Sequence, residues 1–116
     1  MFALLEKLLK LNDYQKTIEQ FAIYPGAGTG NKEAMIYTAL GLAEEAGEYA
    51  GKIAKYIRDG VFETSLAAKE LGDVLWQLAR AAKELNMTLE DVAVMNIQKL
   101  LDRRDRNVIK GNGDVR

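Results

Sequence analysis

Apolar residues recur every three or four positions along most of this chain, which is the period of an α-helix and not of a β-strand. The longest such pattern lies between residues 31 and 58. Its apolar seam consists of Ile36, Ala39, Ala43, Ala46, Ala50, Ile53 and Ile57. Asn31 is suited to cap the start of a helix here, and Gly60 is suited to end it. We therefore expect one long helix from about residue 31 to residue 58.

Shorter patterns predict helices on either side of this one. Before it, Asn12 and Asp13 are candidate caps for a helix over roughly residues 13–23, with a short turn of helix ahead of it. After it, a helix is expected to start at Thr64 or Ser65. The apolar side of that helix consists of Ala67, Leu71, Val74, Leu75, Leu78 and Leu85.

A fourth helix is predicted in the last third of the chain. Asn86 suits the end of the preceding helix, and Thr88 with Asp91 resembles a capping arrangement, although Asp replaces the usual Glu or Gln. The new helix should run to about Arg106. No strand-like alternation and no internal repeat stand out, so we predict an all-α fold.

The 116 residues fit a single domain spanning the whole chain, 1–116. The only proline and three glycines cluster at residues 25–30, which we expect to form a flexible loop. The tail from about residue 108 to residue 116 is polar and glycine-rich, and we expect it to be extended or mobile.

Composition narrows the chemistry and the partners. The formal net charge is −1, which does not predict binding to polymeric nucleic acid or to a membrane surface. The absence of cysteine suits a reducing cytosol, and the absence of histidine excludes His-based acid–base chemistry and His-ligated metals. Charges interrupt the start too early for a leader, and no apolar run approaches the ~20 residues that span a membrane. We expect a cytoplasmic protein.

The candidate chemistry lies in two carboxylate clusters. Glu44, Glu45 and Glu48 fall in the long helix, and Glu70 and Asp73 fall in the next one. Residues three or four apart share one face of a helix, so each cluster presents a pair of adjacent carboxylates. If the two helices face each other, the converged oxygens need a hard cation to offset their repulsion. Oxygen-only ligands suit Mg²⁺, Mn²⁺ or Ca²⁺.

A simple solvated face would look similar, because the first cluster lies nearly opposite the apolar seam of its helix. Three observations favour a site. Gly41, Gly47 and Gly51 lie on or beside the acidic side, where each costs about 1 kcal/mol relative to Ala. Trp76 lies opposite the apolar seam of its own helix and should be covered by something else, for which we expect a second copy. The acidic pairs also recur on consecutive helices.

The fourth helix carries a complementary set, Asn96, Lys99 and Arg103. One interpretation is a helix terminus stabilised by cations, with a single satisfied core asparagine. The other is an anion-binding edge, with the two cations on phosphate oxygens and the amide on a base or sugar edge.

These residues resemble the MazG-like nucleotide pyrophosphohydrolases of the all-α NTP pyrophosphohydrolase superfamily. The family signature is E-E-x-x-E followed by E-x-x-D on the next helix, here Glu44 to Glu48 and Glu70 to Asp73. The surroundings are also similar, namely Leu42-Ala43, Val74-Leu75-Trp76, Asn96-Ile97-Gln98-Lys99-Leu100, Tyr14-Gln15 and Gly111-Asn112-Gly113-Asp114.

The resemblance implies Mg²⁺-dependent cleavage of a nucleoside triphosphate, NTP or dNTP, to the monophosphate and pyrophosphate, with Mn²⁺ as a substitute ion. It implies a helical bundle with a four-helix core that is completed in a homo-oligomer, a dimer or a tetramer. The residues implied as metal ligands are Glu45, Glu48, Glu70 and Asp73. Glu44 is implied as a further ligand or as the group that orients the attacking water, with Glu45 sharing the catalytic role. Asn96, Lys99 and Arg103 are the implied substrate contacts.

The competing hypothesis is an all-α oligomeric interaction or regulatory protein whose acidic cluster is structural or degenerate. Carboxylate clusters without turnover would be identical in sequence. Metal-dependent pyrophosphate release from nucleotides separates the two hypotheses.

Overall fold

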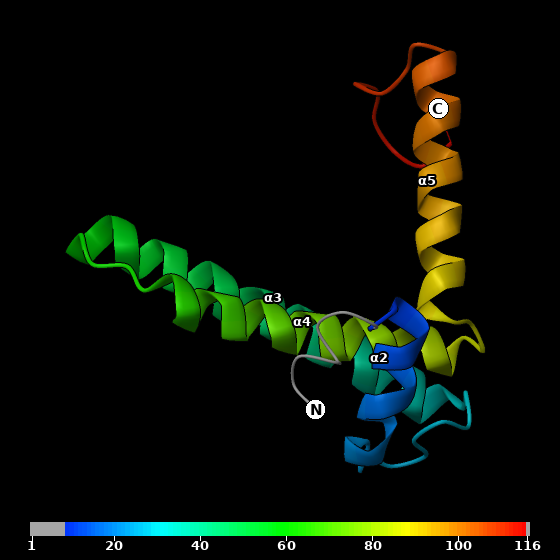
Figure 1. The fold of residues 1–116 in the computed structure, drawn as a ribbon, viewed down its shortest axis with the longest axis horizontal. Helices are drawn as coiled ribbons and strands as arrows, with labels where there is room; N and C mark the ends of the chain where they lie inside the picture. Colours follow the sequence, from blue (N-terminus) through cyan, green and yellow to red (C-terminus); the bar gives the residue numbers. More distant parts are fainter. Residues whose placement is uncertain (1–8, 116) are drawn as a thin grey trace.

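The computed structural model describes residues 9–115, which form helices and connecting loops with no β-strand in that range (Figure 1). The elements in chain order are α2 (Leu11–Thr17), the 3₁₀ helix η1 (Ile18–Phe21), α3 (Lys32–Asp59), α4 (Thr64–Glu84) and α5 (Leu89–Asp105). The all-α prediction is confirmed. The turn of helix expected ahead of α2 lies outside the described residues.

The fold consists of a long arm, formed by the helix pair α3 and α4, and of α5, which runs away from this arm. Figure 1 shows α3 and α4 lying side by side and antiparallel, with α2 packed near one end of this pair. From the same end, α5 runs away from the arm at a steep angle. The tail returns along α5, where Asp114 forms ion pairs with Lys99 and Arg103, each at 3.2 Å.

Capping interactions explain where α3 starts and ends and where α5 starts. The Asn31 side chain accepts a hydrogen bond from the Ala34 amide at 2.8 Å, which confirms the predicted start of α3. Gly60 ends that helix in the left-handed conformation, with a φ of 74°. At the start of α5, the Thr88 hydroxyl and the Asp91 carboxylate each accept the other residue's amide at 3.0 Å. The predicted capping arrangement is confirmed.

The first helix starts earlier and ends sooner than predicted, and its expected caps have other partners. Asp13 lies inside α2, and its carboxylate accepts the amide of Lys10, which is the residue that precedes the helix. Asn12 instead accepts the amide of Glu90 at 3.0 Å, so it caps α5 across the fold. Helical hydrogen bonding then tightens into the 3₁₀ helix η1.

The apolar sides of the two long helices are only partly buried within one chain. Ile36 and Ile57, on the expected apolar seam of α3, are 50% and 79% exposed. On α4, Leu71 and Leu85 are exposed, whereas three polar residues are buried, namely Gln77, Arg80 and Glu84. Within one chain the acidic sides of α3 and α4 therefore face each other, and much of each apolar seam remains exposed.

A small core joins the arm to the rest of the fold. Its buried residues are Ile18, Ala79, Ala82 and Leu89. Trp76 packs against this core and meets the Tyr24 ring edge-on, with 6.5 Å between centroids. Segments of the same chain therefore cover part of Trp76. That a second copy covers the rest stays a prediction. Gln15 links α2 to α4 and α5. Its side-chain NH₂ group donates hydrogen bonds to the carbonyls of Ala79 and Met87, and its side-chain oxygen accepts one from the Leu89 N–H.

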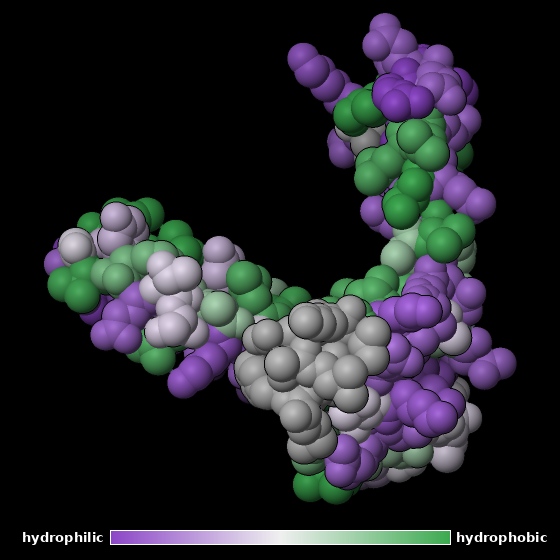
Figure 2. Space-filling model, in the orientation of Figure 1, coloured by the Kyte–Doolittle hydropathy of each residue, from purple (hydrophilic) through white to green (hydrophobic). Residues whose placement is uncertain are grey.

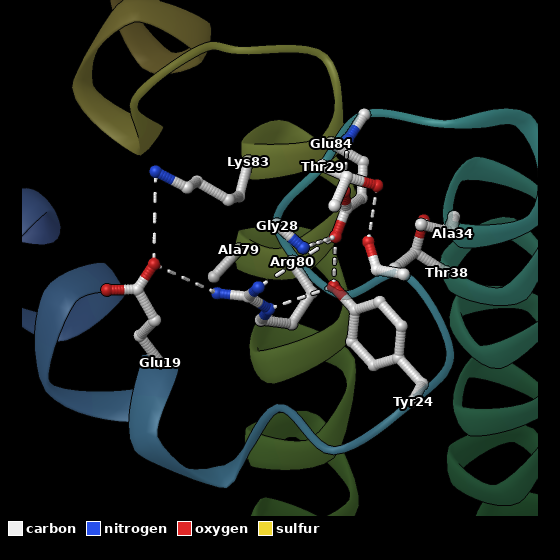
Figure 3. Close-up of polar contacts among 12 residues, drawn as sticks. Glu19, Tyr24, Gly28, Thr29, Ala34, Thr38, Ala79, Arg80, Lys83 and Glu84 are labelled. Carbon is white, nitrogen blue, oxygen red and sulfur yellow. Dashed lines mark hydrogen bonds and ion pairs between the residues drawn. The ribbon is translucent and has the colours of Figure 1, made fainter.

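The glycine-rich loop is anchored by a buried carboxylate, which we call the Glu84 latch (Figure 3). Glu84 accepts the amides of Gly28 and Gly30, at 2.8 and 2.9 Å, and the hydroxyl of Tyr24. Both glycines have positive φ, 82° and 72°, which L side chains rarely adopt. Arg80 donates to the same hydroxyl at 3.1 Å. The latch ties the loop before α3 to the end of α4, so it helps to set the register of the arm.

Candidate metal centre

Three carboxylates from the two helices of the arm converge. Glu45 comes from α3, and Glu70 and Asp73 come from consecutive turns of α4. One oxygen from each residue lies within 4.8 Å of the other two. The spacing of three places Glu70 and Asp73 on one face of α4, and the antiparallel packing of α3 brings Glu45 opposite them.

Oxygen atoms at this spacing fit a hard divalent cation. Such ions bind oxygen at about 2.1–2.5 Å, so ligands on opposite sides of one ion are ~4–5 Å apart. Glu45 and Glu70 are half-buried and Asp73 is exposed, which leaves the group open to solvent on one side. The three residues therefore fit a hard divalent cation, with coordination positions left for water and substrate oxygens.

The electrostatics of the group also favour a cation. Burial raises the pKa of Glu45 above its ordinary value, and further increases come from the negative charges of Asp73, Glu44, Glu70 and Glu48. In the absence of an ion these carboxylates repel one another. A bound divalent cation would stabilise the charged form of Glu45 and lower its pKa again.

Two of the predicted residues lie at the edge of this group. Glu44 and Glu48 are exposed, and neither belongs to the converged set. Glu48 follows Glu45 by nearly one turn on α3, so it lies on the same side of the helix. The roles of both residues remain predictions.

Of the three glycines expected to allow a close approach, Gly41 does so within this chain. A Cβ at Gly41 would lie 2.3 Å from the side-chain amide nitrogen of Gln77. At Gly47 and Gly51 a Cβ would meet nothing within 4 Å among the described residues. The expectation of a close approach is therefore confirmed for Gly41 and is not met at the other two positions.

The structure adds a residue that sequence reasoning did not assign to the site. Burial, and then the negative charge of Asp73, raise the pKa of the Tyr14 phenol. The phenol is thus within electrostatic reach of the carboxylates, although it lies on α2, far away in sequence. In the sequence, the only indication of a role for Tyr14 was that it is among the residues that resemble the family.

The predicted substrate contacts are grouped on α5, away from the carboxylates. Lys99 and the buried Arg103 share the carboxylate of Asp114, which places the two cations on one edge, as predicted. Asn96 is exposed, so the expectation of a buried amide is wrong. It lines a shallow, mainly apolar hollow with Met87, Val92, Met95 and Lys99. Because α5 leaves the arm, one chain does not bring this edge to the acidic group (Figure 1).

The fold and the carboxylate group define an all-α protein with a candidate divalent-metal centre in a helical hairpin. Residues 34–109, which include all of α4 and α5 and almost all of α3, match the family model of the MazG nucleotide pyrophosphohydrolase domain. The chain therefore belongs to the MazG family.

A relative of this chain is the Gene 37 protein of Mycobacterium phage L5. It is 44% identical over 110 residues, which cover 89% of this chain and 96% of that protein. No solved structure matches the chain. Among the described helices, none has the length and apolar character needed to cross a membrane.

Proposed function

We propose that this protein is a cytoplasmic, Mg²⁺-dependent nucleoside triphosphate pyrophosphohydrolase that removes nucleotides from the cellular pool. It converts an NTP or dNTP to the monophosphate and pyrophosphate. The observation that carries the proposal is the convergence of Glu45, Glu70 and Asp73 inside the region that matches the MazG domain.

In this proposal the carboxylates hold the metal and prepare the attack. Glu45, Glu70 and Asp73 bind the ion, with Glu48 joining them from the next turn of α3. Mg²⁺ held there would neutralise phosphate charge and make the attacking water more acidic. The chain has no histidine, so Glu44 or another carboxylate of the group orients the attacking water and receives its proton. Attack at the α-phosphorus expels pyrophosphate.

The edge of α5 supplies the substrate contacts in the proposal. Lys99 and Arg103 bind the β,γ portion of the triphosphate, and Asn96 contacts the base or the sugar. Helix α5, which carries these residues, runs away from the helix pair that carries the carboxylates of the same chain (Figure 1). We therefore propose that the α5 edge of a second copy completes the site. The cations are then released from Asp114, which they now share.

A homo-oligomer, a dimer or a tetramer, is the first expected result. Apolar side chains reach the surface along both the arm and α5 (Figure 2), including Leu40 at 67% exposed. Burying such a seam between copies is favourable by ~25 cal/mol for each Å² of apolar surface. We expect multi-angle light scattering at micromolar concentration to give at least a dimer, and Leu40→Glu to shift it toward monomer. Ile23→Glu is the matched control, because Ile23 is 93% exposed in a loop. A monomeric wild type would contradict this expectation.

The products of the reaction test the proposed function itself. Incubation of a panel of NTPs and dNTPs with the protein and Mg²⁺ should yield monophosphate and pyrophosphate in equal amounts, measured by anion-exchange chromatography without added pyrophosphatase. Diphosphate with free phosphate would indicate attack at the γ-phosphorus and overturn the proposal. No product from any nucleotide would favour the interaction protein with a degenerate site.

A further inference from the structure

The side-chain oxygen of Gln77 is buried without a hydrogen-bond partner, one helical turn from the acidic group. The residue is 7% exposed, and its Oε1 atom has no partner among the described residues. Leaving a buried polar group unpaired costs about 1–3 kcal/mol. Buried amides in folded proteins are nearly always paired, so an unpaired one next to a candidate site calls for a ligand.

The backbone of α3 makes room for this amide. A Cβ at position 41 would lie 2.3 Å from the amide nitrogen of Gln77 and 2.6 Å from its oxygen. Only glycine therefore lets the amide lie where it does. Glycine in a helix interior destabilises the helix by about 1 kcal/mol relative to Ala. At position 41, this destabilising residue makes room for the side-chain amide of Gln77.

The register of the arm places the amide one turn away from the carboxylates. Gln77 follows Asp73 by four residues on α4, and Gly41 precedes Glu45 by four residues on α3. Four helical residues correspond to ~6 Å along the axis. The amide is thus a neighbour of the metal group, on the side away from the tip of the arm, and is too far along the arm to belong to the group itself.

We propose that Gln77 binds the nucleoside part of the substrate, that is, the sugar or the base edge. This inference rests on the proposed function and extends it to substrate selection. A neutral amide offers two N–H donors and an oxygen acceptor, which matches hydroxyl groups and base edges. It carries no charge, so it is a poor partner for the triphosphate. In the proposed function, the metal and the cations of α5 bind the triphosphate. Rotation of the amide by half a turn presents either its oxygen or its NH₂ group to the ligand.

Replacement by a side chain of similar shape separates binding from packing. Gln77→Met keeps the length of the side chain and removes the amide. We expect it to weaken binding of a non-hydrolysable α,β-methylene nucleoside triphosphate by about tenfold, measured by calorimetry with Mg²⁺. Binding of inorganic tripolyphosphate, which lacks the nucleoside, should be unchanged. In turnover, KM should rise more than kcat falls.

Gly41→Ala tests the same amide without altering Gln77. The new methyl group displaces the flexible end of Gln77, while alanine favours the helix. We expect the same selective loss of nucleotide affinity and a thermal midpoint no lower than that of the wild type.

Three other outcomes would contradict either the inference about Gln77 or the proposed function. Nucleotide affinity unchanged in Gln77→Met would make Gln77 a packing residue and overturn the inference, leaving the proposed function intact. Equal losses for the nucleotide and for tripolyphosphate would overturn it too, because the amide would then serve the metal or the phosphates. A wild type that binds and hydrolyses no nucleotide would overturn the proposed function together with this inference.

Discussion

Asp73→Asn is expected to lower nucleotide turnover by at least about a hundredfold while the metal-free protein keeps its stability or gains some. The substitution removes a negative oxygen from the group formed with Glu45 and Glu70. Metal binding weakens because one anionic ligand is lost. Folding without metal is eased because the remaining carboxylates repel each other less, as the raised pKa of Glu45 indicates.

Steady-state kinetics and thermal unfolding, with and without Mg²⁺, check this prediction. In the wild type Mg²⁺ should raise the unfolding midpoint, and EDTA should reverse the rise, since a ligand that binds only the folded state stabilises it. Asp73→Asn and Glu45→Gln should lose most of this rise. Asp105→Asn is the matched control, an exposed carboxylate at the end of α5. Activity near that of the wild type in Asp73→Asn would mean that this residue is not a ligand.

Glu48→Gln tests the part of the ligand set that the family resemblance implies and the converged group does not include. Because Glu48 lies nearly one turn beyond Glu45, we expect this variant to lose turnover as well and to remain folded. Retained turnover with full Mg²⁺ stabilisation would restrict the ligands to the three converged carboxylates. If both Glu48→Gln and Asp73→Asn unfold, the acidic cluster is structural.

Glu84→Gln is expected to destabilise the fold by about 3 kcal/mol at pH 7, which is the range for breaking a buried ion pair. Glu84 is 3% exposed and lies 3.8 Å from Arg80, which is 1% exposed. Glutamine keeps only one acceptor oxygen, so its NH₂ group would face the amide donor of either Gly28 or Gly30, and the latch would lose hydrogen bonding as well as charge. Urea unfolding followed by circular dichroism measures the loss.

An exposed partner of the same arginine provides the matched control. The Glu19 side chain is 52% exposed and lies 4.0 Å from Arg80, so Glu19→Gln should cost less than about 1 kcal/mol. Equal losses in the two variants would show that the latch adds nothing beyond a surface ion pair.

The pH dependence of the latch follows from the pKa of Glu84. Burial alone would raise this pKa, but hydrogen bonds from Tyr24, Gly28 and Gly30 and the charge of Arg80 lower it below the ordinary value of 4.5. The charged carboxylate therefore stabilises the fold above pH 4.5, and the contribution is lost as pH falls below that value. The stability difference between wild type and Glu84→Gln should shrink between pH 7 and pH 3.5.

Several features of this protein followed from the sequence alone because they depend on neighbours along the chain. Asn31 and Thr88 cap their helices through amides three residues away, and Gly60 ends α3 by adopting a positive φ. The spacing of Glu70 and Asp73 places them on one face of any helix. The all-α fold and the pairing of carboxylates on one face of each helix could therefore be predicted from local rules.

The inward face of each helix was decided only by the tertiary structure. The apolar seam containing Ile36 and Ile57 resembled a core face, yet the single chain leaves it exposed. Helical periodicity shows that a face is apolar but does not say what covers it, and in an assembly that cover can be another copy.

The buried polar groups also could not be predicted from the sequence, because their hydrogen-bond partners are remote along the chain. Glu84 is joined to Gly28 and Gly30, which lie 54 to 56 residues away, and Gln15 to the Leu89 amide, 74 residues away. Nothing near these residues in the chain indicates such pairs. Burial becomes favourable for them only when packing of α2, α4 and the glycine-rich loop supplies the matching donors and acceptors, which is a property of the folded chain.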